Sequence, residues 1–432
     1  MKIFVLTLGC PKNIVDSERL MSGLLSSSIQ FVDQVEQADV VIINTCAFIL
    51  PAREEAIEAI LEAVELKKRA KIERIYVTGC LPQRYIEEVK KEIPEVDGFF
   101  AEQNFTEIAV QLAARFNVRS DRAAARRVFQ TPGHFAYLKI AEGCDNCCHY
   151  CTIPLIKGNY QSRPIEDVVD EAKLLADSGV RELIIVAQDS TYYGSDRRDK
   201  NALSRLIPKL TAISNIEWIR LLYAHPAHIN DQLIQLYQNE EKLCRYIDLP
   251  IQHISDRILK SMGRKTTSDT IKRIVDKLRT TIPGIAIRTT LMVGYPGEQD
   301  EDFKLLREFV TTTRLERLGV FKYYAEEGTR SFYLPDQVAE QVKDERLEEI
   351  MEVQSEISLE KNQELIGKTL SVIIDEQDDA SPGFIGRTQW DSPSIDNIVH
   401  VNGNLQCGII YPVTIDAVAE YEIWGEFNSN DS

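Results

Sequence analysis

Strand-like apolar runs alternate with amphipathic helical runs along most of this chain, and the alternation limits the folds open to it. Near the N-terminus the runs KIFVLTLG, DVVIINT and RIYVTG have the length and composition of buried strands. Helical periodicity lies between and after them, at Asp16–Leu25, Ala52–Lys68 and Pro82–Lys91. Strands and helices in alternation form parallel sheets. We therefore predict an N-terminal flavodoxin-like parallel α/β domain over residues 1–118.

The alternation stops at a basic, alanine-rich stretch, Arg119–Arg127, so we predict a linker over residues 119–133. It restarts with six strand-like runs: FAYLKIAEG, ELIIVAQ, WIRLLYA, YIDLPI, IAIRTTLMVG and LGVFKYY. Six β/α units in series predict a partial (β/α)6 TIM-type barrel over residues 134–365, whose working face is the carboxyl ends of the strands. A long charged helix at Val338–Leu365 follows the last strand. Short strand-like runs between SPG and NGN turns predict a small antiparallel, OB-like β-barrel over residues 366–432.

Charge and cysteine content exclude several classes of protein. The chain carries 67 acidic and 50 basic side chains, a net charge of −17, which disfavours nucleic acid as its main partner. Nine cysteines without a secretory signal indicate thiols in a reducing cytoplasm and not a disulfide scaffold. The apolar part of the opening run MKIFVLTLGC is shorter than the ~7–15 residues of a signal-peptide core. No apolar run reaches the ~18–20 residues of a membrane span, so we expect no membrane partner.

The strongest chemical signal is the segment EGCDNCCHYCTIP, which follows a predicted strand. It places Cys144, Cys148 and Cys151 in C-x3-C-x2-C spacing, in a loop short enough for three thiolates to face one centre. Iron–sulfur clusters take soft thiolate ligands, and a cubane cluster held by three of them leaves one iron open to chelate a substrate. The alternative is a four-ligand zinc knuckle, which the extra Cys147 would have to complete.

A second set of cysteines is spread over the N-terminal domain. Cys10, Cys46 and Cys80 each end a predicted buried strand, in FVLTLGC, VVIINTC and RIYVTGC. Because the carboxyl ends of parallel strands line one crevice, we expect these sulfurs to come together and to bind a second metal centre. The alternative is three separate buried cysteines that act as small apolar side chains.

These motifs resemble a known family. The C-x3-C-x2-C loop, with Tyr150 before its last cysteine, resembles the radical S-adenosylmethionine superfamily, and the N-terminal domain is similar to that of the methylthiotransferases. The start LGCPKNIVDSE resembles the RimO type, which modifies an aspartate of small-subunit ribosomal protein S-twelve, whereas the tRNA-modifying branch typically reads GCQMN there. CTIPLIKGNYQSRP, VAQDSTYYG, GYPGE and YYAEEGT agree, so the resemblance spans nearly the whole chain, including a C-terminal TRAM domain. The chain departs from the pattern at Cys147, where a basic residue is common, and at Ala325, which replaces the usual proline.

The resemblance implies two [4Fe–4S] clusters, a radical-generating one on the loop cysteines and an auxiliary one on the N-terminal set. It also implies two molecules of S-adenosylmethionine per turnover: one donates a methyl group to a sulfur associated with the auxiliary cluster, and the other is cleaved to a 5′-deoxyadenosyl radical. The radical abstracts hydrogen from the β-carbon of the aspartate, so no side chain is predicted to be catalytic. A flavodoxin or ferredoxin is the expected reductant. The predicted cofactor contacts are Tyr150, Gln188, Gly294, Pro296 and Gly297, for which a loop amide and simple turns are the alternative readings.

The predicted C-terminal barrel is strongly acidic. From Ile366 to Ser432 it carries eleven acidic residues against Lys368 and Arg387, a net charge of −9. RNA binding needs a basic groove, whereas a basic ribosomal protein would complement this surface. We therefore expect a protein substrate docked by the acidic barrel. The alternatives are a tRNA adenosine methylthiotransferase, a related enzyme acting on another protein or small molecule, and a non-enzymatic iron–sulfur electron carrier.

Overall fold

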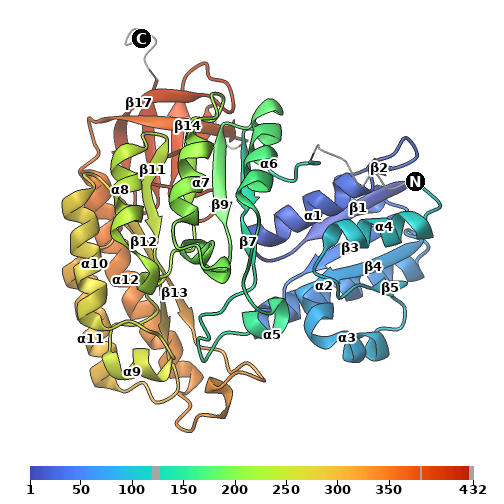
Figure 1. Cartoon of the computed structure of the whole chain (residues 1–432), viewed down its shortest axis with the longest axis horizontal. Helices are drawn as coiled ribbons and strands as arrows, with labels where there is room; N and C mark the ends of the chain where they lie inside the picture. Colours follow the sequence, from blue (N-terminus) through green and yellow to red (C-terminus); the bar gives the residue numbers. More distant parts are fainter. Residues whose placement is uncertain (119–126, 380–381, 428–432) are drawn as a thin grey trace. The chain divides into compact units, whose positions relative to one another are not determined.

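The computed structural model of the chain describes residues 1–118, 127–379 and 382–427, so residues 119–126 of the predicted linker lie outside it. The chain divides into two compact units (Figure 1). The first comprises Met1–Thr131, Tyr137–Gln161 and Glu326–Phe332, and the second comprises Pro132–Ala136, Ser162–Ala325 and Tyr333–Ser432. Within the described ranges, no helix has both the length and the apolar character needed to cross a membrane.

The first unit contains a five-stranded parallel sheet with the order β2-β1-β3-β4-β5, which confirms the predicted flavodoxin-like arrangement. Alternate residues of its central strand face opposite sides. Val41 and Ile43 pack with α2 and α3, while Val40 and Ile42 pack with α1 and α4, so helices cover both faces (Figure 1). The strands are β1 (Lys2–Thr7), β2 (Gln30–Phe31), β3 (Val40–Thr45), β4 (Arg74–Gly79) and β5 (Gly98–Phe99). The helices are α1 (Pro11–Gly23), α2 (Leu50–Lys68), α3 (Cys80–Glu92) and α4 (Phe105–Arg115).

A six-stranded sheet with the order β13-β12-β11-β10-β9-β6 forms the predicted partial barrel. The strand pairs from β9 to β13 are parallel, as successive β/α units require. The strands are β6 (Phe135–Lys139), β9 (Glu182–Val186), β10 (Trp218–Leu221), β11 (Leu243–Asp248), β12 (Ala286–Val293) and β13 (Arg317–Lys322). The connecting helices are α6 (Ile165–Asp177), α7 (Ala202–Thr211), α8 (Asp231–Asn239), α9 (Asp256–Ser261), α10 (Ser268–Thr281) and α11 (Asp300–Thr313).

The tail forms a closed barrel with the order β14-β15-β16-β18-β17, preceded by the predicted long helix, α12 (Glu340–Gln363). Its strands are β14 (Thr369–Gln377), β15 (Phe384–Thr388), β16 (Ile398–Asn402), β17 (Ile410–Val418) and β18 (Glu422–Glu426). The pairs are antiparallel, as predicted, except β16 with β18, which is parallel. Five strands cannot alternate in direction around a closed ring, so one parallel pair is unavoidable.

Several acidic residues of the tail are internal. They pair with three arginines and one histidine that are buried or half-buried within the second unit, where an unpaired cation would be costly. These pairs are Asp391 with Arg317 at 2.6 Å, Asp396 with Arg288 at 3.3 Å, and Asp375 with Arg387 at 2.6 Å and with His134 at 2.7 Å. The net charge of the tail therefore overstates the acidity of its surface, because these carboxylates hold the barrel against the sheet.

Candidate metal centres

The three N-terminal cysteines lie at the carboxyl edge of the first sheet. Cys10 precedes α1 as its N-cap, Cys46 directly follows β3, and Cys80 directly follows β4 as the first residue of α3. Because β1, β3 and β4 are adjacent and parallel, the chain passes this edge three times, each time with a cysteine. Cys10 and Cys80 also lie at helix N-termini, where the helix dipole favours a thiolate.

Two glycines allow the cysteine-bearing turns to approach one another. Gly9 has φ +92°, and a Cβ added there would lie 2.7 Å from Cys46 Cβ and 3.0 Å from its Sγ. Gly79 also has φ +92°, and its added Cβ would lie 2.6 Å from the backbone nitrogen of Thr45. Both separations are shorter than van der Waals contact, so only glycine fits.

The cysteines at this edge influence one another electrostatically. Burial raises the pKa of the Cys80 thiol to about 12; Lys157 opposes this shift, while Cys46 and Cys10 add to it. Burial likewise raises the pKa of Cys46, and Cys10 adds to that shift. As thiolates the three sulfurs would repel one another, and metal ions among them would relieve the repulsion. Three thiolate donors at one edge therefore fit the predicted iron–sulfur cluster.

A lysine that we did not single out from the sequence faces the same cysteines. Lys157 ends the short helix α5 (Ile153–Lys157), and it is only 6% exposed. Among the residues that the structure describes, none forms a hydrogen bond with its Nζ atom. Burial alone would lower the pKa of Lys157, but the negative charge of Glu142, followed by that of Cys80, raises this pKa above its usual value. The signal in the sequence is its place in CTIPLIKG, six residues after the third loop cysteine, Cys151.

The loop cysteines Cys144, Cys148 and Cys151 are all half-buried, as is the predicted cofactor contact Tyr150. The amide of Cys144 donates to the carbonyl of Gly158 at 3.1 Å, and the amide of Cys151 donates to the carbonyl of Cys148 at 3.1 Å. These bonds fold the loop into a compact turn, which fits three thiolates around one centre. All nine cysteines lie within the described ranges, and none forms a disulfide.

The extra Cys147 is the exposed cysteine of this loop, and it has φ +53°. Two residues further on, His149 is held in place: its carbonyl accepts from the amide of Ser331 at 3.0 Å, and its ring nitrogen Nε2 lies 3.1 Å from Arg330. The loop cysteines and the N-terminal cysteines thus belong to the same compact unit.

The motif YYAEEGT joins this unit through a buried carboxylate. Glu326 is 1% exposed, and its Oε2 accepts from Arg53 at 2.7 Å and from Arg84 at 2.8 Å. Arg84 also donates to the carbonyl of Glu327 at 2.7 Å. Two arginines from α2 and α3 therefore fix a segment that lies far away in the sequence. Sequence reasoning noted only that Ala325 departs from the usual proline, and it missed Glu326.

In the second unit, Gln188 is half-buried after β9, and Asp189 follows it in a buried position. One carboxylate oxygen of Asp189 accepts the amides of Thr191 and Tyr192 in the 3-10 helix η2 (Ser190–Tyr192), while the other lies 2.7 Å from Nδ1 of His228. His228 was not predicted. The side chains of Asp189, His225 and His228 offer three ligand atoms within 4.8 Å of one another.

Hydrogen bonding argues against a metal at this trio. Nδ1 of His225 accepts the amide of Ala227 at 3.1 Å. In a neutral ring the proton then lies on Nε2, which makes that nitrogen a donor and not a ligand. Burial, with Arg264 next, lowers the pKa of His225 to about 3, so the ring is neutral. We therefore interpret the trio as a hydrogen-bonded cluster.

The predicted cofactor loop GYPGE is tightly folded. Gly294 has φ +72°, and a Cβ there would lie 2.9 Å from Cδ of Lys343. Gly297 has φ +79°, and Pro296 between them is buried. The amide of Gly294 donates to Glu298 Oε2 at 2.8 Å. The close approach at Gly294 is therefore made to a side chain of α12, which accounts for the glycine without a ligand.

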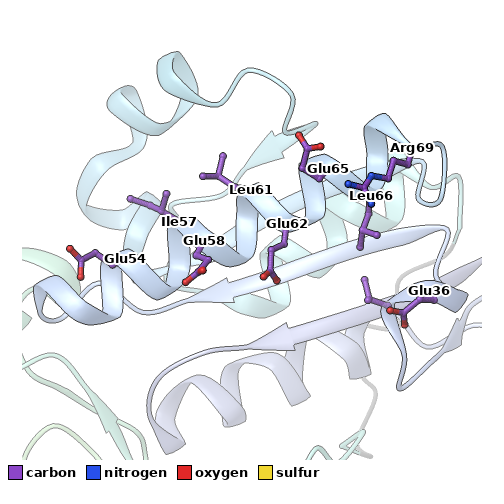
Figure 2. A pocket seen from close by; sticks show the side chains of 10 residues that line it. Glu36, Glu54, Ile57, Glu58, Leu61, Glu62, Glu65, Leu66 and Arg69 are labelled. Carbon is purple, nitrogen blue, oxygen red and sulfur yellow. The ribbon is translucent and has the colours of Figure 1, made fainter.

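A groove of about 790 Å³ runs along α2, away from the predicted site residues. Figure 2 shows glutamates and apolar side chains of α2 along it. Its lining is Val35, Glu36, Glu54, Ile57, Glu58, Leu61, Glu62, Glu65, Leu66 and Arg69. No cysteine lies among them, so this groove is separate from the candidate metal centres.

Family models match three parts of the chain. Residues 2–101 match the uncharacterized protein family UPF0004, residues 138–310 match the radical SAM superfamily, and residues 366–427 match the TRAM domain. Among solved structures, the radical S-adenosylmethionine methyltransferase TsrM from Kitasatospora setae aligns with a TM-score of 0.53 at 14% identity, covering 76% of each chain. The cobalamin-dependent radical enzyme OxsB aligns with a TM-score of 0.51 at 12% identity, covering 81% of this chain and 56% of its own. These structures support the fold.

Whole-chain relatives are much more similar. A protein of Christiangramia forsetii named ribosomal protein uS12 methylthiotransferase RimO is 45% identical over 428 residues, covering 98% of this chain and 94% of its own. Proteins of the same name from Lachnoclostridium phytofermentans and Clostridioides difficile are each 43% identical. They cover 98% and 99% of this chain, and 99% and 98% of their own length.

Proposed function

Because the chain belongs to the RimO family of ribosomal protein uS12 methylthiotransferases, we propose that it methylthiolates the β-carbon of an aspartate in uS12. The chain is a radical S-adenosylmethionine enzyme. The observation that carries the substrate assignment is the 45% identity over 98% of the chain to a relative of that name. A cytoplasmic location, where ribosomal proteins are available, and a flavodoxin- or ferredoxin-type reductant belong to this proposal.

We assign one [4Fe–4S] cluster to Cys144, Cys148 and Cys151. We assign a second cluster to Cys10, Cys46 and Cys80 at the carboxyl edge of the first sheet, here called the edge cysteines. With S-adenosylmethionine bound, the first cluster supplies the electron that generates a radical able to attack an unactivated carbon. The compact loop supports the first assignment, and the edge geometry supports the second. The proposed contacts of S-adenosylmethionine are Tyr150 in the first unit and Gln188, Gly294, Pro296 and Gly297 in the second unit.

The acidic surface of the tail is the proposed docking site for the basic substrate. Ribosomal proteins that bind RNA are rich in Lys and Arg, so opposite charges would steer the encounter. The internal carboxylates are excluded from this surface. Its proposed members are the exposed residues Glu376, Asp379, Asp416, Glu420, Glu422 and Glu426, opposed by the exposed Lys368.

The decisive experiment compares single-cysteine variants on uS12 and on tRNA. Cys148→Ala should abolish formation of 5′-deoxyadenosine, because the radical-generating cluster loses a ligand. Cys46→Ala should still cleave the cofactor but yield no methylthiolated product. Cys244→Ala is the matched control, because Cys244 is buried in β11 and is not a proposed ligand. Mass detection of the methylthio group on tRNA, and not on uS12, would refute the proposed substrate.

A further inference from the structure

Lys157 is a buried cation that influences the edge cysteines electrostatically, and the proposed function gives it no role. Its α5 neighbour Ile156 packs into the same apolar core as Cys80 and Leu81, which fixes α5 beside the cysteine edge. The carbonyl of Ile156 also accepts from Gln103 at 3.3 Å. The lysine is therefore held in place by packing around it and not by a bond to its own ammonium.

The carboxylates near Lys157 are bonded to another lysine. Asp16 and Glu142 both accept from Lys139, the latter at 2.6 Å. Lys157 lies within electrostatic range of both carboxylates, as well as of Cys80 and Cys10, but its Nζ makes no hydrogen bond in the described parts of the chain. Burying an ammonium without hydrogen bonds is costly, so a site that keeps one has an anionic ligand to satisfy it.

The charge at the edge indicates which ligand that is. A [4Fe–4S]²⁺ core on three thiolates has a net charge of −1, and a sulfur anion beside it brings the total to −2. In a buried site, that second negative charge needs a positive neighbour. Building on the proposed function, we propose that Lys157 is a positioning residue whose ammonium holds a small sulfur anion, such as hydrosulfide, at the edge formed by Cys10, Cys46 and Cys80.

The test measures binding and not turnover. The full chain carrying Cys148→Ala is reconstituted anaerobically, so that the edge site holds the cluster, and titrated with sodium hydrosulfide while the cluster spectrum is followed. Lys157→Met should weaken hydrosulfide binding at least tenfold, because a single charge is lost from a buried site. Lys157→Arg, which keeps the charge, should stay within threefold of the parent.

Two controls separate charge from structure. Lys67→Met removes a charge from a partly exposed pair with Asp97 in the same unit and should leave the affinity unchanged. Methyl isocyanide, a neutral ligand of iron, should bind Lys157→Met and the parent equally. Unchanged hydrosulfide affinity in Lys157→Met would overturn the inference, as would equal weakening of both ligands. If the Cys148→Ala protein holds no cluster, the two-cluster proposal fails and this inference fails with it.

Discussion

Replacing Gly79 with alanine tests how the structure brings the edge cysteines together. An alanine at φ +92° costs about 1–2 kcal/mol in backbone strain. Its Cβ would also lie 2.6 Å from the nitrogen of Thr45, and overlap of this kind costs about 1–3 kcal/mol more. We therefore expect the variant to be destabilised by about 2–5 kcal/mol, or to relax by moving Cys80 out of the edge.

Thermal unfolding and iron content of the anaerobically reconstituted protein measure both outcomes. If Cys80 moves, about half of the iron should be lost, because one of two four-iron clusters loses a ligand. Gly179→Ala is the matched control, since Gly179 has φ +101° but an added Cβ there meets open space. Gly179→Ala should lose only the stability that backbone strain costs, about 1–2 kcal/mol, and should retain its iron. Equal stability and full iron in the two variants would refute the steric account of the edge.

Three further predictions concern other groups. Burial lowers the pKa of His253 to about 3, so as the pH falls below about 6.5 this histidine is protonated in the unfolded chain before it is protonated in the folded one. Between pH 6 and 4, the wild type should therefore lose about 1.4 kcal/mol more unfolding free energy per pH unit than His253→Gln, and equal pH dependence of the two proteins would contradict this. Glu326→Gln should destabilise the protein by about 3–5 kcal/mol in thermal unfolding, because two arginines lose a buried partner, whereas the exposed Glu65→Gln should be silent. Reversing Glu376 and Asp379 to Lys should weaken uS12 binding most at low salt without changing cofactor cleavage, whereas reversing the internal Asp375 should impair folding.

The fold and the cysteine positions could be predicted because both depend on the order of the chain. Alternating strands and helices dictate a parallel sheet, and parallel strands bring their carboxyl ends to one edge. The three cysteines that end strands therefore had to meet there, and the C-x3-C-x2-C spacing confines the other three to one loop. Their assignment as cluster ligands remains the prediction tested by the cysteine variants.

The charges could not be predicted in the same way. In sequence Asp375, Asp391 and Asp396 look like part of an acidic surface, but each pairs with a buried or half-buried residue that lies far away along the chain, namely His134, Arg317 and Arg288 in turn. In sequence Lys157 looks like an ordinary basic residue, and only packing buries its ammonium within electrostatic range of Cys80. The chain order determined which backbone segments meet, because that follows from local periodicity. The tertiary structure decided which charges are buried and paired, because burial and pairing depend on side chains that meet only after folding.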